Sequence, residues 1–185
     1  MDVQILISLQ GQYATAALAT AWQASINQLW NQQSWDVGEC RVKFTASVDA
    51  GGKASNQITV GSPGVKGRSF VLGVGGNSGT WYADAGNWTP AHETGHLMGL
   101  GDRYTDVGGV SVPNPGWKGN VMGDFGGIAE LRNVQEILKR NMGTWDHGTV
   151  SSVAALFEHV DVSRTNSVLG ELQSGPSAVR RLCPC

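Results

Sequence analysis

The sequence is poor in charged residues. They make up 15% of the 185 positions, where about 25% is usual, and the formal net charge is −2. The 13 lysines and arginines are scattered along the chain and form no basic run. This composition argues against a nucleic-acid-binding protein and against a protein that binds anionic membrane surfaces.

Long apolar runs are also missing. No stretch approaches the roughly 20 apolar residues of a membrane-spanning helix. The opening residues, MDVQILISLQ, carry neither the basic segment nor the small-residue cleavage site of a signal peptide. We therefore expect no membrane span. The abrupt start on a strand pattern indicates a mature or excised domain.

Cysteines are few, and they stand at positions 40, 183 and 185. An odd number cannot pair completely within one chain. Cys40 alternates with Val42 and Phe44, which predicts a buried thiol on a strand. Free thiols are therefore favoured over a disulfide framework. The terminal Cys-Pro-Cys can also bind a metal or supply an inhibitory metal ligand, and its role stays open.

Glycine, in contrast, is abundant, with 26 residues at about twice the usual frequency. Extended segments and turns should therefore be plentiful. Residues 18–30 place apolar side chains at helical spacing and predict a helix. Period-2 alternation and short β-branched runs predict strands at residues 3–9, 40–48, 57–60 and 68–76, with residues 80–84 a further short strand or a loop.

The second half of the chain contains two further helix patterns. Thr89 and Pro90 form a plausible N-cap and first helical residue, so a helix should begin there. Residues 99–127 are rich in Gly, Pro, Asn and Asp and predict a loop, whereas apolar spacing returns over residues 128–142. We predict one domain over residues 1–147, followed by an extension over residues 148–185 with a short helix and a loose tail.

The segment HETGHLMGLGD, residues 92–102, contains two of the four histidines. His92 and His96 are four residues apart, so a helix presents both on one face, where they can bind one ion. Glu93 lies beside the pair, and its carboxylate can reach a metal-bound water as a general base. This spacing is typical of zinc metallopeptidases.

A catalytic zinc usually has three protein ligands and one open position. Asp102 lies six residues after His96, and on a continuous helix it would point away from the histidines, about 240° further round. Gly99 can adopt the left-handed conformation that ends a helix, after which Asp102 can face the histidines. Glu130, near the start of a later helix, is the alternative third ligand, as in gluzincins, although its surroundings lack the gluzincin pattern.

HETGHLMGLGD resembles the extended motif of the metzincin metallopeptidases, H-E-x-x-H-x-x-G-x-x-H or D, with Asp as third ligand as in the snapalysin-like branch. GNVMGDFGG, residues 119–127, resembles the family's Met-turn, which places Met122 beneath the histidines. The resemblance implies an α+β fold. Its parts are a twisted, mostly parallel sheet with an antiparallel edge strand, a backing helix, an active-site helix and a C-terminal helix.

The sequence departs from the family at one position. Many metzincins carry a Tyr two residues after the methionine, and here that residue is Asp124. Tyr104 is the nearest alternative oxyanion helper, although a packing role explains it equally well. The glycine-bearing run over residues 71–76 is a candidate edge strand for pairing with an extended substrate. Three tryptophans are candidates for an apolar cleft or for the core, namely Trp81, Trp88 and Trp117.

These features predict a zinc metalloendopeptidase that hydrolyses a protein or peptide substrate. His92, His96 and Asp102 hold Zn²⁺, and Glu93 is the general base that activates the attacking water. The alternative is a non-catalytic, zinc-stabilised protein-binding module. Such a site needs no Glu93, and structural zinc usually has four protein ligands. Residues 102–123 also resemble peptidase domains carried as C-terminal cargo of bacterial polymorphic (Rhs-type) toxins. This resemblance implies secretion or delivery from a bacterial cell, with an immunity protein as partner.

Overall fold

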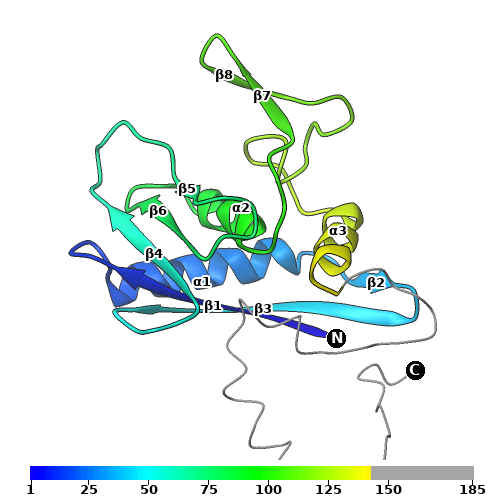
Figure 1. Cartoon of the computed structure of the whole chain (residues 1–185), viewed down its shortest axis with the longest axis horizontal. Coiled ribbons are helices and arrows are strands. Elements are labelled where there is room, and N and C mark those ends of the chain that lie inside the picture. The colour runs from blue at the N-terminus through cyan, green and yellow to red at the C-terminus, as the bar shows by residue number, and fades with distance from the viewer. Residues whose placement is uncertain (143–185) are drawn as a thin grey trace, which may run out of the picture.

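A six-stranded sheet with the order β2-β3-β1-β4-β6-β5 forms the centre of the computed structural model, which describes residues 1–142 (Figure 1). The four inner strands are parallel, namely β3 (Cys40–Ala50), β1 (Asp2–Gln10), β4 (Asn56–Gly61) and β6 (Ser78–Tyr82). At the two edges, β2 (Trp35–Val37) and β5 (Phe70–Val71) pair antiparallel to β3 and β6. The expected α+β class and mostly parallel sheet are confirmed, with two antiparallel edge strands instead of one.

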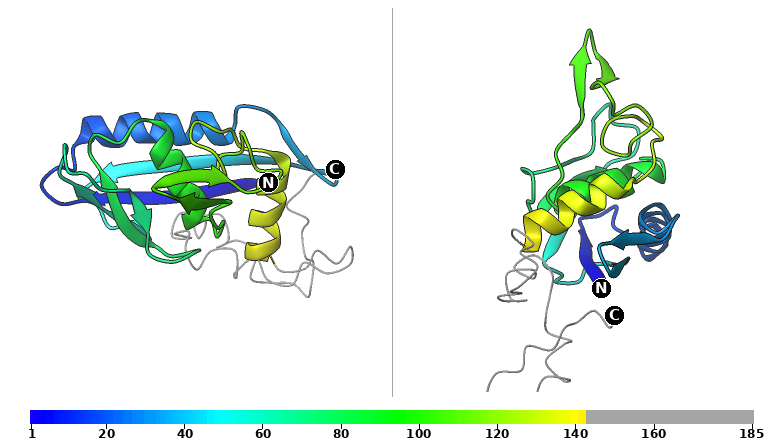
Figure 2. Two further views of the ribbon diagram at one scale, coloured as in Figure 1. Left: turned by 90° about the horizontal axis from the view of Figure 1, so that it is seen from above. Right: turned by 90° about the vertical axis from the view of Figure 1, so that its right-hand side faces the viewer.

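Helix α1 (Ala16–Trp30) runs along β3 (Figure 2). It also contacts α2 (Trp88–Leu97). Its N-cap residue is Thr15, whose side chain accepts a hydrogen bond from the Leu18 amide. Two amide side chains of α1 and one at its C-cap bind the edge of β3 that β2 leaves unpaired. Gln23, Asn27 and the C-cap residue Asn31 accept from the backbone amides of Val48, Ala46 and Phe44. The exposed strand edge is thereby covered.

A β-hairpin projects away from the sheet (Figures 1 and 2). It consists of β7 (Tyr104–Val107) and β8 (Val110–Pro113), joined by Gly108 and Gly109. Both glycines have positive φ angles, 59° and 82°, as a two-residue type I′ turn requires. The sequence prediction of a loop throughout residues 99–127 is therefore wrong for this segment. The last element, α3 (Leu131–Met142), follows after a further loop.

Two helix starts differ from the sequence prediction. Helix α2 begins at Trp88, with Asn87 at the N-cap position and no side-chain cap, so Thr89 is not the cap. Pro90 is accommodated at the third helical position because amides of the first turn need no partner within the helix. Helix α3 begins at Leu131 and not at residue 128. The Ile128 carbonyl accepts from the Val121 amide, and the first carbonyl to accept from the helix is that of Glu130.

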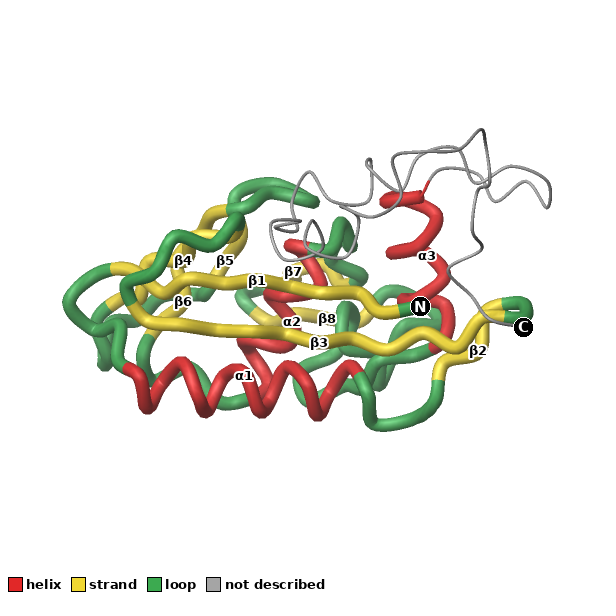
Figure 3. The backbone as a smooth tube through the Cα atoms, turned by 90° about the horizontal axis from the view of Figure 1, so that it is seen from below, coloured by secondary structure: helices red, strands yellow, loops and turns green. Residues whose placement is uncertain are grey.

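The predicted strand over residues 68–76 is reduced to the two residues of β5. Gly73 and Gly75 have φ angles of 80° and 76°, which turn the chain out of the sheet, and Figure 3 draws this connection as a loop. The 71–76 run is therefore not a continuous edge strand. Instead, the Gly75 amide donates to the His96 carbonyl at 2.8 Å and ties this loop to the end of α2.

Cys40 lies at the start of β3 and is disulfide-bonded, so the expectation of a free thiol is wrong for this residue. The predicted extension over residues 148–185, with Cys183 and Cys185, lies outside the described residues. Within residues 1–142, no helix is long and apolar enough to cross a membrane.

Candidate metal centre

Helix α2 is held from both sides. On one side, the Trp30 indole of α1 donates to the Ala91 carbonyl at 3.0 Å. On the other side, Gly95 lies against the side chain of Met122, which is only 1% exposed. The helix that carries His92, Glu93 and His96 is thereby fixed between the backing helix and the turn that contains Met122.

Backbone carbonyls orient both imidazole rings. His92 Nδ1 lies 2.7 Å from the Val121 carbonyl oxygen, and His96 Nδ1 lies 2.8 Å from the Leu100 carbonyl oxygen. Because a carbonyl oxygen only accepts, each Nδ1 carries the hydrogen and donates it. The Nε2 atom of each neutral ring then presents its lone pair on the opposite side, as a metal ligand requires.

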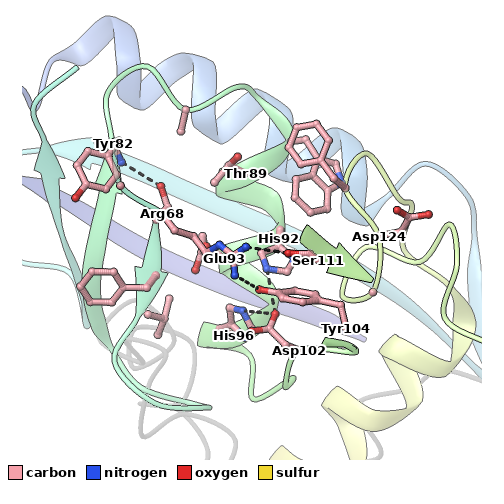
Figure 4. Close-up of a pocket in the computed structure, with 18 of the residues that line it drawn as sticks. Arg68, Tyr82, Thr89, His92, Glu93, His96, Asp102, Tyr104, Ser111 and Asp124 are labelled. Atoms are coloured by element: carbon pink, nitrogen blue, oxygen red, sulfur yellow. Dashed lines mark hydrogen bonds and ion pairs between the residues drawn. The ribbon is translucent and has the colours of Figure 1, made fainter. Parts of the chain in front are cut away.

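The end of α2 brings Asp102 back to the histidines. Gly99 has a φ angle of 95°, and the Leu100 amide donates to the Gly95 carbonyl at 2.9 Å, so the chain reverses after Met98. Asp102 Oδ1 lies 3.4 Å from His92 Nε2 and 3.3 Å from His96 Nε2 (Figure 4). The three donor atoms all lie within 4.8 Å of one another.

This donor set fits a zinc ion. Ligand distances of about 2.0 to 2.1 Å in a tetrahedral site separate neighbouring donor atoms by about 3.3 Å. The two nitrogen–oxygen distances of 3.4 and 3.3 Å match that separation. A cation or a proton is also needed between the groups, because two nitrogen lone pairs and a carboxylate oxygen otherwise repel one another.

The Asp102 carboxylate interacts with both imidazole rings. Burial raises the pKa of Asp102, but hydrogen bonds from His92 and His96 outweigh this effect and hold the pKa well below its usual range. Burial lowers the pKa of His96, yet hydrogen bonds to Asp102 and to the Leu100 carbonyl raise it overall. The metal-free site therefore favours a positive charge at the position where a metal cation fits.

Glu93 is placed beside this group and does not belong to it. Its side chain is buried, with 3% of the residue exposed, and within residues 1–142 its Oε2 atom has no hydrogen-bond partner. Burial raises the pKa of Glu93, although the neighbouring His92 and His96 oppose the increase. A buried carboxylate with a free oxygen and a raised pKa is a stronger base than an exposed one.

The group opens into a cleft of about 660 Å³. Tyr104 lines it, and its hydroxyl accepts a hydrogen bond from Arg68 Nη1 at 3.3 Å. Burial, together with the negative charge of Asp102, raises the pKa of Tyr104 to about 12. The phenol therefore keeps its proton at neutral pH, and its side-chain hydrogen bond with Asp102 contributes to this increase in pKa.

The three candidate tryptophans lie in different places. Trp88 lines the cleft and stacks on the His92 ring, with centroids 4.8 Å apart. Trp81 is fully buried in the core, where it packs against Trp22. Trp117 lies between the guanidinium groups of Arg103 and Arg132 and does not line the cleft.

A polar bridge beside His92, His96 and Asp102 was not predicted from the sequence. Arg68 donates to Asp106 Oδ2 at 3.0 Å and to Ser111 Oγ at 2.8 Å, so it joins the loop before β5 to the β7–β8 hairpin (Figure 4). The hairpin itself could have been predicted from the sequence, because the Gly108-Gly109 pair between alternating valines is a signal for a two-residue hairpin turn. Nothing in the sequence around Arg68 indicates its partners.

Asp124 and Glu130 make local contacts. Asp124, at the position of the metzincin tyrosine, accepts a hydrogen bond from the Gly119 amide at 3.0 Å and closes the turn around Met122. Glu130, the alternative third ligand, pairs with Arg132 at 2.7 Å. In the described part of the chain, the donor group contains Asp102 and not Glu130.

Known proteins resemble this chain only weakly. No family model and no curated protein matches the chain. One solved structure of myroilysin is similar with 15% identity and a TM-score of 0.35, over 54% of this chain and 49% of that one. A second myroilysin structure gives 14% identity and a TM-score of 0.37, over 80% and 68%. This chain spans about half the length of the first structure. Likeness at this level carries no functional inference for this chain.

Proposed function

We propose that the protein is a zinc-dependent metalloendopeptidase, with His92, His96 and Asp102 as metal ligands and Glu93 as general base. One observation carries this proposal: His92 Nε2 and His96 Nε2 converge on Asp102 Oδ1 at tetrahedral separations, and the buried carboxylate of Glu93 lies beside them with one oxygen unpartnered among the described residues. Zinc, when bound, acidifies a water molecule and polarises a carbonyl group.

The residues of the chain divide the remaining work. Glu93 accepts the proton of the attacking water as the new carbon–oxygen bond forms, and delivers it to the amine nitrogen as the carbon–nitrogen bond breaks. We propose that the Tyr104 hydroxyl, which stays protonated and lines the cleft, donates a hydrogen bond to the oxygen that gains negative charge. The cleft beside α2 is the proposed site of the peptide substrate.

The test is the substitution Glu93→Ala. The purified variant should keep the zinc content and the unfolding temperature of the wild type, because Glu93 is not a metal ligand. The rate at which it cleaves a protein substrate should fall by about 10²- to 10⁴-fold. Normal cleavage by the variant, or loss of its zinc, would overturn the role of Glu93.

The same variant separates the enzyme from the non-catalytic binding module. A module that uses zinc only for stability would show no proteolysis in the wild type and no effect of Glu93→Ala on partner binding. The unpartnered oxygen and raised pKa of Glu93 favour the enzyme. Delivery as a bacterial toxin, with an immunity protein as partner, rests on the sequence resemblance and stays a prediction.

A further inference from the structure

Helix α3 contacts each of the three segments that carry or orient a metal ligand. Asn133 bonds to Asn120, beside the carbonyl that orients His92. Glu136 bonds to Arg103, the residue after Asp102. Asn141 donates to the Met98 carbonyl in the turn after His96. Glu136 and Asn141 lie three and eight residues after Asn133, so the three side chains share one face of the helix.

The first contact fixes the partner of His92. Asn120 and Asn133 are both buried and exchange side-chain hydrogen bonds of 2.8 and 3.2 Å. Asn120 Oδ1 also accepts from the Met122 amide at 2.9 Å. Val121 stands between Asn120 and Met122, and its carbonyl is the group to which His92 Nδ1 donates. The amide pair therefore holds the backbone that sets the orientation of the His92 ring.

The second contact fixes the approach of Asp102. Arg103 Nη2 lies 2.9 and 2.8 Å from the two carboxylate oxygens of Glu136, and the Arg103 backbone amide donates to the Met122 carbonyl at 2.7 Å. The ring of Trp117 lies against the same guanidinium at 4.8 Å. The side chain of Asp102 itself is 41% exposed, so its position depends on how firmly this adjacent residue is held.

We propose that Asn133 and Glu136 are positioning residues, which align His92 and Asp102 for the metal before it binds. The proposal rests on the function proposed above for the same site. Groups that orient metal ligands from outside typically change metal affinity by about 10- to 100-fold when they are removed. Their removal should act on metal binding even though neither side chain reaches the metal.

Glu136→Gln is the decisive variant, and Glu130→Gln is its matched control. Both substitutions remove one carboxylate charge at or near the same helix, but Glu130 pairs with Arg132 and not with a ligand-bearing segment. The zinc dissociation constant is measured by competition with a chromogenic chelator. We expect an increase of about 10- to 100-fold for Glu136→Gln. Glu130→Gln should keep the wild-type constant.

One further measurement excludes a general loss of stability. In EDTA, Glu136→Gln and Glu130→Gln should unfold at similar temperatures, because partly exposed ion pairs add little to folding. Asn133→Ala should weaken zinc binding too, together with a lower unfolding temperature from the lost buried hydrogen bonds.

The outcomes separate this inference from the function on which it rests. Tight zinc binding by the wild type with an unchanged constant for Glu136→Gln would overturn the positioning role alone. A Glu136→Gln variant that loses affinity only in proportion to its lower unfolding temperature in EDTA would overturn it as well. A wild-type protein that binds no zinc would overturn both the proposed function and this inference.

Discussion

The side chain of Met122 fills the space beneath Gly95 of helix α2. A Cβ atom added at Gly95 would stand 2.5 Å from Met122 Sδ and 3.2 Å from its terminal carbon. The indole of Trp30 closes the same space at 3.4 Å. Helix α2 can therefore lie this close to the turn that contains Met122 only because residue 95 has no side chain.

Gly95→Ala should consequently destabilise the protein, although alanine is the better helix former. The added methyl group must displace a buried methionine, and overpacking of this kind costs about 1 to 3 kcal/mol. Thermal unfolding of the variant measures the effect. Gly86→Ala is the control, because a Cβ there meets no atom within 4 Å. Equal stability of the two variants would contradict the packing argument.

The grouping of the three proposed metal ligands is local enough to be predicted from the sequence. Helical periodicity places His92 and His96 on one face, and a left-handed Gly99 turns the chain so that Asp102 joins them within eleven residues. The central strands were predicted for a similar reason, since alternation of buried and exposed residues along β3 is visible in the sequence.

The contacts that support the site could not be predicted in this way. Arg68 and Asp106 are 38 positions apart in the sequence, and Asn120 and Asn133 are 13 positions apart. These pairs form because folding brings distant segments together, and neither has a periodic pattern. The boundaries of β5 also depend on pairing with β6, which ends where Gly73 turns the chain away.

Removal of the third ligand should remove the metal. Asp102→Ala leaves two histidines, so the purified variant should contain little zinc, whereas Asp102→His should retain it with an altered pH dependence of activity. Zinc per protein molecule is measured by elemental analysis. Chelation should also lower the unfolding temperature of the wild type, because zinc binds the folded state. Stoichiometric, tightly held zinc in Asp102→Ala would show that another residue completes the site.

The bridge from Arg68 should matter for catalysis more than for stability. Arg68→Met removes the hydrogen bonds to Tyr104, Asp106 and Ser111, so the hairpin and the phenol lose their common anchor. We expect kcat/KM to fall by up to about 100-fold through misplacement of groups at the site. The unfolding temperature should change little, because exposed ion pairs contribute little to stability.

Arg41→Met is the matched control for this experiment. Arg41 forms a comparable exposed ion pair with Asp36, at 3.1 Å, on the edge of the sheet. Its loss should leave zinc content, kcat/KM and unfolding temperature unchanged. If both arginine variants reduce activity equally, or if Arg68→Met loses its zinc, the bridge does not act by positioning Tyr104.

Apolar side chains at the rim of the cleft predict which peptides are cleaved well. Val65, Phe70, Val74 and Phe125 line the cleft, and all four are exposed, Phe125 to 82%. Phe125 also contacts Trp88, with ring centroids 4.9 Å apart. Because exposed apolar groups gain free energy when a ligand covers them, peptides with apolar residues beside the scissile bond should bind best.

Phe125→Ser should therefore raise KM for such a peptide, by about 10-fold if most of the phenyl ring is covered in the complex. The value of kcat should change little, because the side chain of Phe125 has no part in the proposed chemical step. Ile128→Ser is the control, since Ile128 is also exposed, to 50%, but does not line the cleft. The decisive comparison uses two peptides that differ only in apolar or charged residues beside the cleaved bond. A KM increase of the same size for both peptides, or for both variants, would show that the rim does not select apolar substrates.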